Sequence, residues 1–225
     1  MNIVIITSVL NPVNKGLIYT STRSVFSEEN RYKQTLKTIE SIRSNIINSY
    51  IVLVECSDVK EEYELEIKNN VDKYINLYSD QNLKNIIESP HKGWGESIQI
   101  LKGIEEIKNF TDIKNIYKIS GRYTVNNKYD KNIDDIEKVV CKKVDNNNLW
   151  KWELPNTIVT VFFKIPKILL NEYYIFLITN QYMYSKGISA EHSIKVFLNN
   201  IKEKEYVNNI GFSGFISVDG TYYEG

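Results

Sequence analysis

The first half of the chain alternates between two hydrophobic patterns. Residues 2–10 (NIVIITSVL) form a continuous, mostly β-branched run, which predicts a strand buried on both faces of a mostly parallel sheet. Ser27, Glu28 and Glu29 then indicate a helix start, because a capping hydroxyl and two carboxylates suit the positive end of the helix dipole. The buried face of this helix is predicted from apolar side chains three and four residues apart, namely Tyr32, Leu36, Ile39, Ile42 and Ile46. A second parallel strand over residues 50–55 completes a β-α-β unit.

The same alternation continues as far as Tyr123. A charged helix is expected near residues 59–69, a short strand at 73–77, a helix at 93–109 and a short strand at 115–120. Strands that alternate with helices predict an α/β fold with a mostly parallel sheet. We therefore interpret residues 1–125 as a Rossmann-like half with a mostly parallel sheet.

Beyond Tyr123 the pattern becomes mixed. Strands are expected over residues 137–144, 149–153 and 157–164, and helices over 166–180 and 189–201. The glycines within residues 211–223 indicate a terminal hairpin. Residues 126–225 are therefore expected to form a mixed α+β half, within a single domain that spans residues 1–225.

Composition and charge exclude several classes of protein. The 28 basic and 28 acidic residues give a formal net charge of zero, which lacks the basic footprint of a protein that grips long nucleic acid. Two cysteines, Cys56 and Cys141, are too few for a disulfide framework, so a reduced, cytoplasmic compartment is expected. No stretch approaches the roughly 20 apolar residues of a membrane helix, so no integral membrane segment is expected and any membrane contact would be peripheral.

Several common catalytic motifs are absent from the sequence. It has no G-x-x-x-x-G-K-[ST] phosphate loop and no G-x-G-x-x-G after the first strand, which disfavours P-loop NTPases and dinucleotide dehydrogenases. A sugar nucleotidyltransferase would need a glycine-rich, basic loop there, whereas residues 7–12 read TSVLNP. Without G-x-S-x-G or H-E-x-x-H, and with His91 and His192 as the only histidines, hydrolase triads are unsupported.

Two short motifs carry a family resemblance. Residues 91–96 (HKGWGE) open the helix predicted near residue 93, and residues 117–123 (YKISGRY) close a predicted strand. In this order, over roughly residues 1–130, the chain resembles small bacterial and large-virus GT-A-fold glycosyltransferases that carry K-G-x-G-E and K-I-S-G-R-Y motifs. The resemblance implies a GT-A-like single domain in which residues 1–125 bind a nucleotide-sugar donor and residues 126–225 bind a glycan or lipid-linked acceptor.

The chain departs from the family where a metal is usually held. GT-A strands at this position usually end in Asp-x-Asp, which binds Mn²⁺ or Mg²⁺, but Ser120, Gly121 and Arg122 stand here. The favoured interpretation is therefore metal-independent catalysis with the nucleotide-sugar as co-substrate, and a bound Mn²⁺ or Mg²⁺ is the alternative. The guanidinium of Arg122 offers a fork for phosphate, Gly121 allows close backbone approach, and Lys92 at a helix start adds a second cation. The structural alternatives are a salt bridge from Arg122 to Asp130, Asp134 or Glu96, and a solvated surface lysine at position 92.

The resemblance also places the nucleotide over the carboxyl ends of the first two strands. The residues expected to contact the donor there are Thr7, Ser8, Val9, Glu55, Ser57 and Asp58, with Arg31 from the following helix and Ser120 from the later strand. Each of them has an alternative role as a cap or turn residue, and Ser57 and Asp58 suit the cap of the next helix.

An inverting transfer needs a base for the acceptor hydroxyl. Glu191 follows the capping residue Ser189 in the second half, about where the family places its catalytic carboxylate, although an acidic first-turn residue also suits a purely structural role. Asp219 is the reserve catalytic candidate and Asp130 a third. Trp152 and His192 are candidate acceptor-binding residues, with core packing as the alternative for the tryptophan.

The sequence thus predicts a glycosyltransferase that moves a sugar from a nucleotide-sugar donor to a glycan or lipid-linked acceptor. The missing Asp-x-Asp motif keeps one other class open, a non-catalytic module that kept the fold and binds a nucleotide or a glycan. A structural protein without a ligand is the third interpretation.

Overall fold

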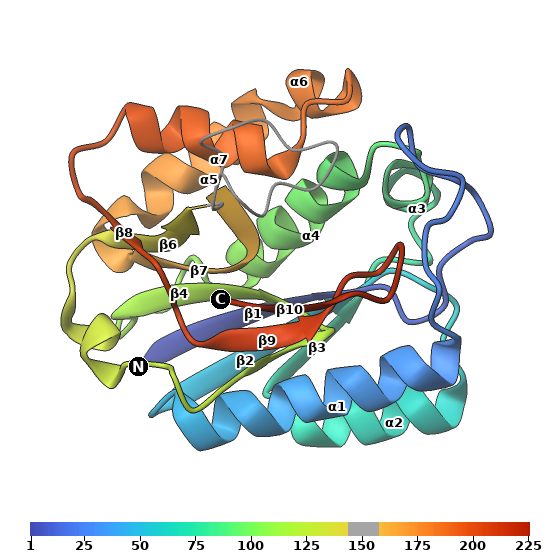
Figure 1. Cartoon of the computed structure of the whole chain (residues 1–225), viewed down its shortest axis with the longest axis horizontal. Coiled ribbons are helices and arrows are strands. Elements are labelled where there is room, and N and C mark those ends of the chain that lie inside the picture. The colour runs from blue at the N-terminus through green and yellow to red at the C-terminus, as the bar shows by residue number, and fades with distance from the viewer. Residues whose placement is uncertain (144–157) are drawn as a thin grey trace.

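A central seven-stranded sheet organises the molecule. The computed structural model describes residues 1–143 and 158–225, and its strands follow the order β3-β2-β1-β4-β7-β6-β8 (Figure 1). Four neighbouring strands are parallel, as predicted for the first half: β3 (Lys73–Asn76), β2 (Ser49–Glu55), β1 (Asn2–Ser8) and β4 (Asn115–Ser120). The second half extends the same sheet through the antiparallel β7 (Ile158–Pro166), then β6 (Val139–Lys143) and β8 (Lys204–Val207).

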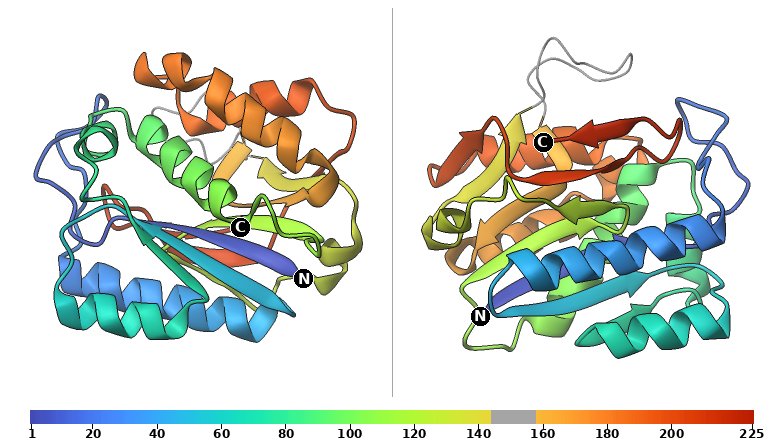
Figure 2. Two further views of the ribbon diagram at one scale, coloured as in Figure 1. Left: turned by 180° about the vertical axis from the view of Figure 1, so that it is seen from behind. Right: turned by 60° about the horizontal axis from the view of Figure 1, so that its bottom comes forward.

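Helices cover both faces of this sheet (Figure 2). One face carries α1 (Glu28–Asn45) and α2 (Glu61–Asn70). The other carries α4 (Lys92–Ile107), α5 (Leu170–Thr179) and α7 (Ala190–Asn199), with the short α3 (Gln81–Ile87) and α6 (Gln181–Ser185) beside them. Two 3₁₀ turns span Lys131–Asp135 and Lys167–Leu169.

The alternation of side chains along β1 explains the two hydrophobic cores. Ile3 and Ile5 join the core under α4, α5 and α7, whereas Val4 and Ile6 join the core under α1 and α2. All four side chains are fully buried. The continuous apolar run at the start of the chain is therefore the centre of a sheet covered on both faces, as predicted.

A small three-stranded sheet joins the C-terminal end of the chain to the segment that follows β4. β9 (Phe212–Phe215) and β10 (Tyr222–Glu224) form the predicted antiparallel hairpin, and β9 also pairs with β5 (Tyr123–Val125) directly after β4. Gly220 has φ +75°, a left-handed conformation that glycine adopts without strain, and so allows the turn. This pairing brings the C-terminal hairpin beside the end of β4.

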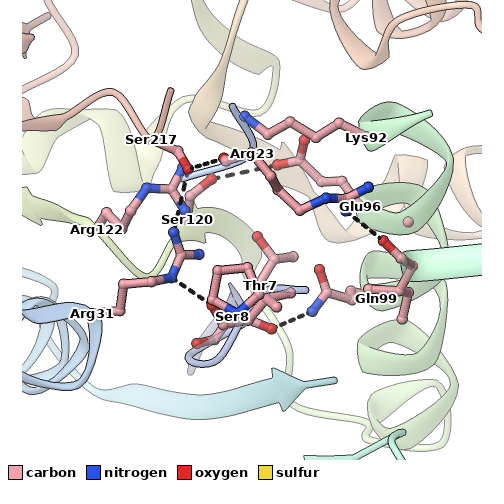
Figure 3. A pocket seen from close by; sticks show the side chains of 14 residues that line it. Thr7, Ser8, Arg23, Arg31, Lys92, Glu96, Gln99, Ser120, Arg122 and Ser217 are labelled. Atoms are coloured by element: carbon pink, nitrogen blue, oxygen red, sulfur yellow. Dashed lines mark hydrogen bonds between the residues drawn. The ribbon is translucent and has the colours of Figure 1, made fainter. Parts of the chain in front are cut away.

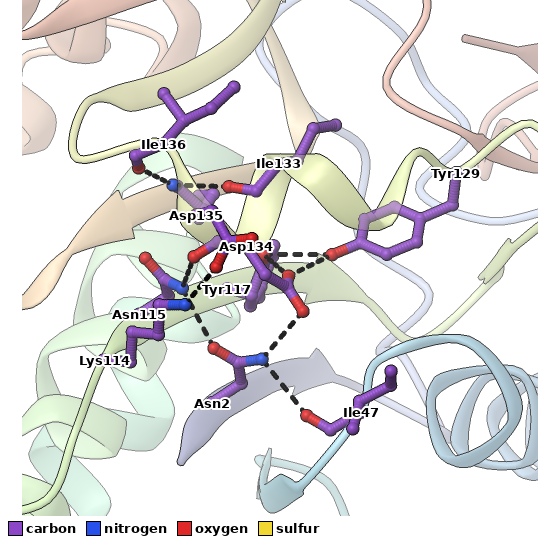
Figure 4. Close-up of polar contacts among 11 residues, drawn as sticks. Asn2, Ile47, Lys114, Asn115, Tyr117, Tyr129, Ile133, Asp134, Asp135 and Ile136 are labelled. Carbon is purple, nitrogen blue, oxygen red and sulfur yellow. Dashed lines mark hydrogen bonds and ion pairs between the residues drawn. The ribbon is translucent and has the colours of Figure 1, made fainter.

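A polar cluster lies at the opposite, amino end of β1 and β4 (Figure 4). The Asp134 carboxylate accepts hydrogen bonds from the hydroxyls of Tyr117 and Tyr129 and from Asn2 Nδ2, which lies 3.1 Å away. Asn115 Nδ2 donates to the Asp134 carbonyl at 2.8 Å. Asp134 therefore fastens the turn at Lys131–Asp135 to the sheet.

Of the boundaries that differ from the expected ones, two lie near the carboxyl ends of β1 and β2. β1 ends at Ser8, because the chain turns away there and the Leu10 amide donates to Glu55 Oε1 at 3.1 Å. α2 begins at Glu61 after Lys60, so Ser57 and Asp58 do not cap it. The strand expected over residues 149–153 lies outside the described residues. Among the described residues, no helix is long and apolar enough to cross a membrane.

Candidate active site

A polar recess opens where β1 and β4 end (Figure 3). The loops after both strands, the start of α4 and the C-terminal hairpin contribute its wall. Four cationic side chains line it, namely Arg23, Arg31, Lys92 and Arg122. Its other polar lining comes from the hydroxyls of Thr7, Ser8, Ser120 and Ser217, the Gln99 amide and the Glu96 carboxylate. The topology thus brings together most of the predicted donor-binding residues.

Arg122 reaches the recess from the tight turn after β4. The Gly121 amide donates to the Thr7 carbonyl at 3.0 Å, and Thr35 Oγ1 donates to the Gly121 carbonyl at 3.0 Å. A Cβ at position 121 would lie only 3.0 Å from Thr35 Oγ1, so glycine allows this close approach. The turn therefore fixes the backbone from which the Arg122 side chain extends.

The Arg122 guanidinium has no hydrogen bond or ion pair to any residue in the described ranges 1–143 and 158–225, and its Nε is buried. The salt bridge considered from the sequence does not form, because the three carboxylates have other roles. Asp134 belongs to the cluster at the far end of the sheet, and Asp130 caps the turn after it by accepting from the Asn132 amide. Glu96 pairs with Lys118 instead.

Arg31 lies deeper and is 5% exposed. Its Nε donates to the Val9 carbonyl at 2.6 Å, and one terminal nitrogen donates to Ser24 Oγ at 3.1 Å and Ser217 Oγ at 3.3 Å. Burial and the neighbouring Arg122 charge lower the pKa of Arg31. Two guanidinium groups so close together, neither with a carboxylate partner in the described part of the chain, make a favourable site for an anion.

Arg23 was not singled out from the sequence and has a different role. It donates to the carbonyls of Lys15, Ile87 and Glu88 at 3.0 Å each, and also to that of Ser89. These bonds tie the long loop after β1 to the end of α3, where carbonyl groups carry partial negative charge. Arg23 is therefore mainly an anchor for the recess wall.

The two glycines of the K-G-W-G-E motif allow the start of α4 to pack closely against its neighbours. A Cβ on Gly93 would lie 2.8 Å from the Ala190 amide nitrogen, and one on Gly95 would lie 2.9 Å from Ile87 Cα. The first turn of α4 thus packs directly against the start of α7 and the end of α3. Lys92 begins the helix and keeps its side chain in contact with solvent. Desolvation by the surrounding atoms and repulsion from Arg122 lower the pKa of its ammonium to about 8.

Lys118 and Glu96 form a buried ion pair behind the recess. Lys118 is 1% exposed, and its Nζ also donates to Ser120 Oγ and to the Thr160 carbonyl, each at 2.8 Å. Burial opposes the ionisation of Glu96, but the charges of Lys118, Lys92 and Arg122 outweigh it and lower the pKa of that carboxyl. Glu96 is therefore a carboxylate whose charge is already balanced.

Glu191 lies beside this pair, at the start of α7. Ser189 caps the helix as predicted, because its Oγ accepts the His192 amide at 3.3 Å. Glu191 Oε1 accepts a hydrogen bond from Thr160 Oγ1 at 2.9 Å, and the contact between Gly93 and Ala190 holds the first turns of α4 and α7 together. His192 Nδ1 lies 2.8 Å from Ser189 Oγ, and its Nε2 is buried without a hydrogen-bond partner in the described residues.

Several predicted residues do not line the recess. Glu55 is fully buried, and its Oε1 accepts from the Leu10 amide, the Cys56 amide and Ser57 Oγ, the last at 2.6 Å. Asp58 is exposed and binds Asn11 through its carbonyl. These two residues and Ser57 brace the loop after β1. Asp219 is exposed in the hairpin turn, where it accepts the Thr221 amide at 2.9 Å. Trp152 lies outside the described residues.

Three polar lining residues, Arg23, Gln99 and Ser217, were given no role by sequence analysis. Gln99 Nε2 donates to the carbonyls of Ser8, at 2.6 Å, and Val54, at 3.1 Å, at the ends of two adjacent strands. Gln99 could have been found from the sequence, because a glutamine among the apolar residues of a helix face needs a polar partner. Ser217 enters the site only because the hairpin pairs with β5, which no local pattern indicates.

The described lining of the recess does not provide a metal site. Glu96 is the one carboxylate in it, and Glu96 is paired with Lys118. Among residues 1–143 and 158–225, no group of three or more His, Cys, Asp or Glu side chains is placed to hold a metal ion. The donor set is that of an anion site rather than a site for Mn²⁺ or Mg²⁺.

Comparison with known proteins identifies the fold. No family model and no curated protein matches the sequence. Among solved structures, the chain is similar to CTP:phosphocholine cytidylyltransferase from Streptococcus pneumoniae, with 12% identity, a TM-score of 0.53, and 97% of this chain and 95% of that one covered. It is also similar to the galactosyltransferase LgtC in complex with donor and acceptor sugar analogs, with 9% identity, a TM-score of 0.51, and 92% and 73% covered. A third similar structure is the inositol-1-phosphate CTP transferase from T. maritima, with 11% identity, a TM-score of 0.51, and 91% and 84% covered. The chain therefore has the predicted GT-A-like α/β fold, which nucleotidyltransferases and glycosyltransferases share.

Proposed function

We propose that the protein is a glycosyltransferase that moves a sugar from a nucleotide-sugar donor to a glycan or lipid-linked acceptor. The observation that carries the proposal is the Arg122 guanidinium, which has no hydrogen bond or ion pair in the described residues and lies beside Arg31 at the carboxyl ends of β1 and β4. In open α/β sheets, ligands bind outside the carboxyl ends of the strands. The cations there suit the diphosphate of the donor.

The charge of the leaving group explains why these cations matter. When the sugar leaves, its diphosphate gains negative charge, and preorganised positive groups lower the barrier by stabilising that charge. Arg122 would bind two phosphate oxygens through its planar fork, and Lys92 at the start of α4 would add a second charge. We infer that these side chains take the place of the metal ion that GT-A enzymes with Asp-x-Asp use. The support is that Glu96, the one carboxylate in the described lining, is paired with Lys118 instead of being open to a metal ion.

Glu191 is the proposed base of an inverting transfer. The acceptor oxygen bonds to the anomeric carbon while the bond from that carbon to the diphosphate oxygen breaks, and the Glu191 carboxylate takes the acceptor proton. The support for this role is its place in the first turn of α7, which packs against the α4 start that carries Lys92. His192, the next residue, is proposed to contact the acceptor.

The test is a product analysis with a matched pair of variants. Wild-type protein is incubated with UDP-, GDP-, CMP- and TDP-sugars and candidate acceptors, and released nucleotide and glycosylated product are quantified. Glu191→Gln is expected to bind the donor as tightly as wild type and to transfer about 10²–10⁴-fold more slowly. Glu172→Gln, which removes another first-turn carboxylate at the exposed start of α5, controls for helix-dipole effects and is expected to retain activity.

Other outcomes separate the alternatives. Release of pyrophosphate from a nucleoside triphosphate would indicate nucleotidyl transfer, the activity in the names of two of the similar structures. Donor binding without turnover against any acceptor would favour the non-catalytic module. Full transfer by Glu191→Gln would remove this residue as the base.

A further inference from the structure

Thr160, near the start of β7, connects the ion pair behind the recess with Glu191. Its carbonyl accepts a hydrogen bond from Lys118 Nζ at 2.8 Å, and its Oγ1 donates to Glu191 Oε1 at 2.9 Å. Thr160 is 4% exposed; the bond that its carbonyl accepts is buried, and the bond that its hydroxyl donates is partly buried. Together with the Lys118–Glu96 pair, they form one continuous polar chain from α4 through β4 and β7 to α7.

We propose that Thr160 is a positioning residue that aims the Glu191 carboxylate at the acceptor hydroxyl. The inference rests on the proposed role of Glu191 as the base. Sequence analysis gave no role to Thr160, because its partner lies 31 residues further along the chain.

The Thr160 hydroxyl is the group that holds the Glu191 carboxylate in place. No ion pair joins Glu191 to a cation in the described parts of the chain, and Thr160 supplies the hydrogen bond that its side chain accepts there. Lys118 is committed to Glu96 and to the Thr160 carbonyl, so it fixes the strand from which the hydroxyl points. A carboxylate held by one donor on one oxygen keeps its other oxygen available for a substrate proton.

Other charged and titratable groups also face Glu191. The groups whose pKa its charge affects are Tyr19 in the loop after β1, Lys92 on α4, Lys118 on β4, Tyr123 on β5 and Tyr184 on α6. His192 adjoins it on α7. Replacing Thr160 leaves all of these side chains in place, so a change at Glu191 would report on the lost hydroxyl.

Thr160→Val removes the donor but keeps the shape and the backbone carbonyl, so the Glu191 carboxylate should lose its fixed orientation. Because transfer needs this carboxylate aimed at the acceptor hydroxyl, kcat should fall while donor binding stays the same. Thr160→Ser keeps the hydroxyl and should restore kcat.

The experiment measures Glu191 in two independent ways. The ¹³C chemical shift of its δ-carboxyl is compared in wild type, Thr160→Val and Thr160→Ser at one pH, and kcat and the donor KM are measured in the same proteins. Thr160→Val is expected to move that chemical shift away from the wild-type value, because a hydrogen bond is lost, and to lower kcat about tenfold with little change in the donor KM. Thr38→Val, which removes another buried threonine hydroxyl that bonds the Gln34 carbonyl at 3.0 Å in α1, should change neither property.

The NMR comparison remains informative even if no transfer is found, so failure of this inference is distinguishable from failure of the proposed function. An unchanged Glu191 chemical shift and kcat in Thr160→Val would overturn it. A Thr160→Ser protein as impaired as the valine variant would overturn it too, because the methyl group would then be the important part. If valine prevents folding, Thr160→Ala provides the same comparison with serine.

Discussion

The cations around the recess differ in what balances their charge. Arg23 is bound to backbone carbonyls, and Lys118 is paired with Glu96. Arg31 bonds only a carbonyl and two hydroxyls, and Arg122 has no hydrogen bond or ion pair in the described residues, where its guanidinium lies over the Tyr123 ring. The first two residues therefore support the structure, whereas the positive charge of Arg31 and Arg122 is available to an anion.

Lys92 gives this anion site a pH dependence. Its lowered pKa of about 8 means that the ammonium is charged below pH 8 and loses its proton above it. Affinity for a nucleotide sugar, whose diphosphate does not titrate in this range, should be constant below about pH 7. It should weaken up to about tenfold as the pH rises through 8 to 9.5, because one charge-assisted contact is lost.

Calorimetric titration of the donor from pH 6.5 to 9.5 measures this effect. Lys92→Gln should bind more weakly at pH 7 and show a flat profile across pH 8. If wild type and Lys92→Gln weaken in parallel with pH, another group titrates and Lys92 does not contact the donor.

At the scale of secondary-structure elements, the first turns of α4 and α7 pack together as one unit. Gly93 lets them meet, since a Cβ there would lie 2.8 Å from the Ala190 amide nitrogen. Lys92 of the proposed donor site and Glu191 of the proposed acceptor site are the neighbours of these two residues. The distance between the two helices thus sets the spacing between the leaving-group cation and the base.

Gly93→Ala should push these helix starts apart. We expect it to cost about 1–3 kcal/mol through overpacking, partly offset by the better helix propensity of alanine, and to lower kcat at least tenfold. Gly103→Ala in the same helix is the matched control, because its Cβ would lie 2.7 Å from Ile5 Cγ2 in the core. Thermal unfolding and kcat are measured together. The account expects both variants to lose stability but only Gly93→Ala to lose rate, and equal kcat values would contradict it.

At the scale of the whole molecule, the fold was largely predictable because its parallel half has strong patterns. The run at residues 2–8 and the helix after Ser27 were found from burial periodicity and capping. β8 was missed because Lys204 and Glu205 occupy half of a four-residue edge strand that has no alternation. α3 was also missed, although Asp80 caps it by accepting the amides of Asn82 and Leu83.

The site was less predictable than the fold. Arg31, Lys92 and Arg122 were found because strand ends and motifs mark them, whereas Arg23 and Ser217 depend on long-range pairing of loops. Lys118 had a signal that was not used, since a lysine within a buried strand requires a partner. Glu55 was expected at the ligand, but its carboxylate braces the loop after β1 instead.

The most direct test of the central claim is a thermal-shift comparison in EDTA. Wild-type protein is melted with UDP, GDP, CMP and TDP and their sugars. Binding at 100 times the Kd adds about 2.7 kcal/mol, or roughly 5–11 °C for a chain of this size. Arg43→Met serves as the control, because Arg43 is a surface arginine that pairs with Asp72 at 2.7 Å outside the recess.

The account predicts that one nucleotide family stabilises wild type and Arg43→Met in EDTA. It also predicts that Arg122→Met stays folded and loses most of that shift. No shift with any nucleotide, a shift that requires Mn²⁺, or an undiminished shift in Arg122→Met would contradict a metal-independent diphosphate site built on Arg122.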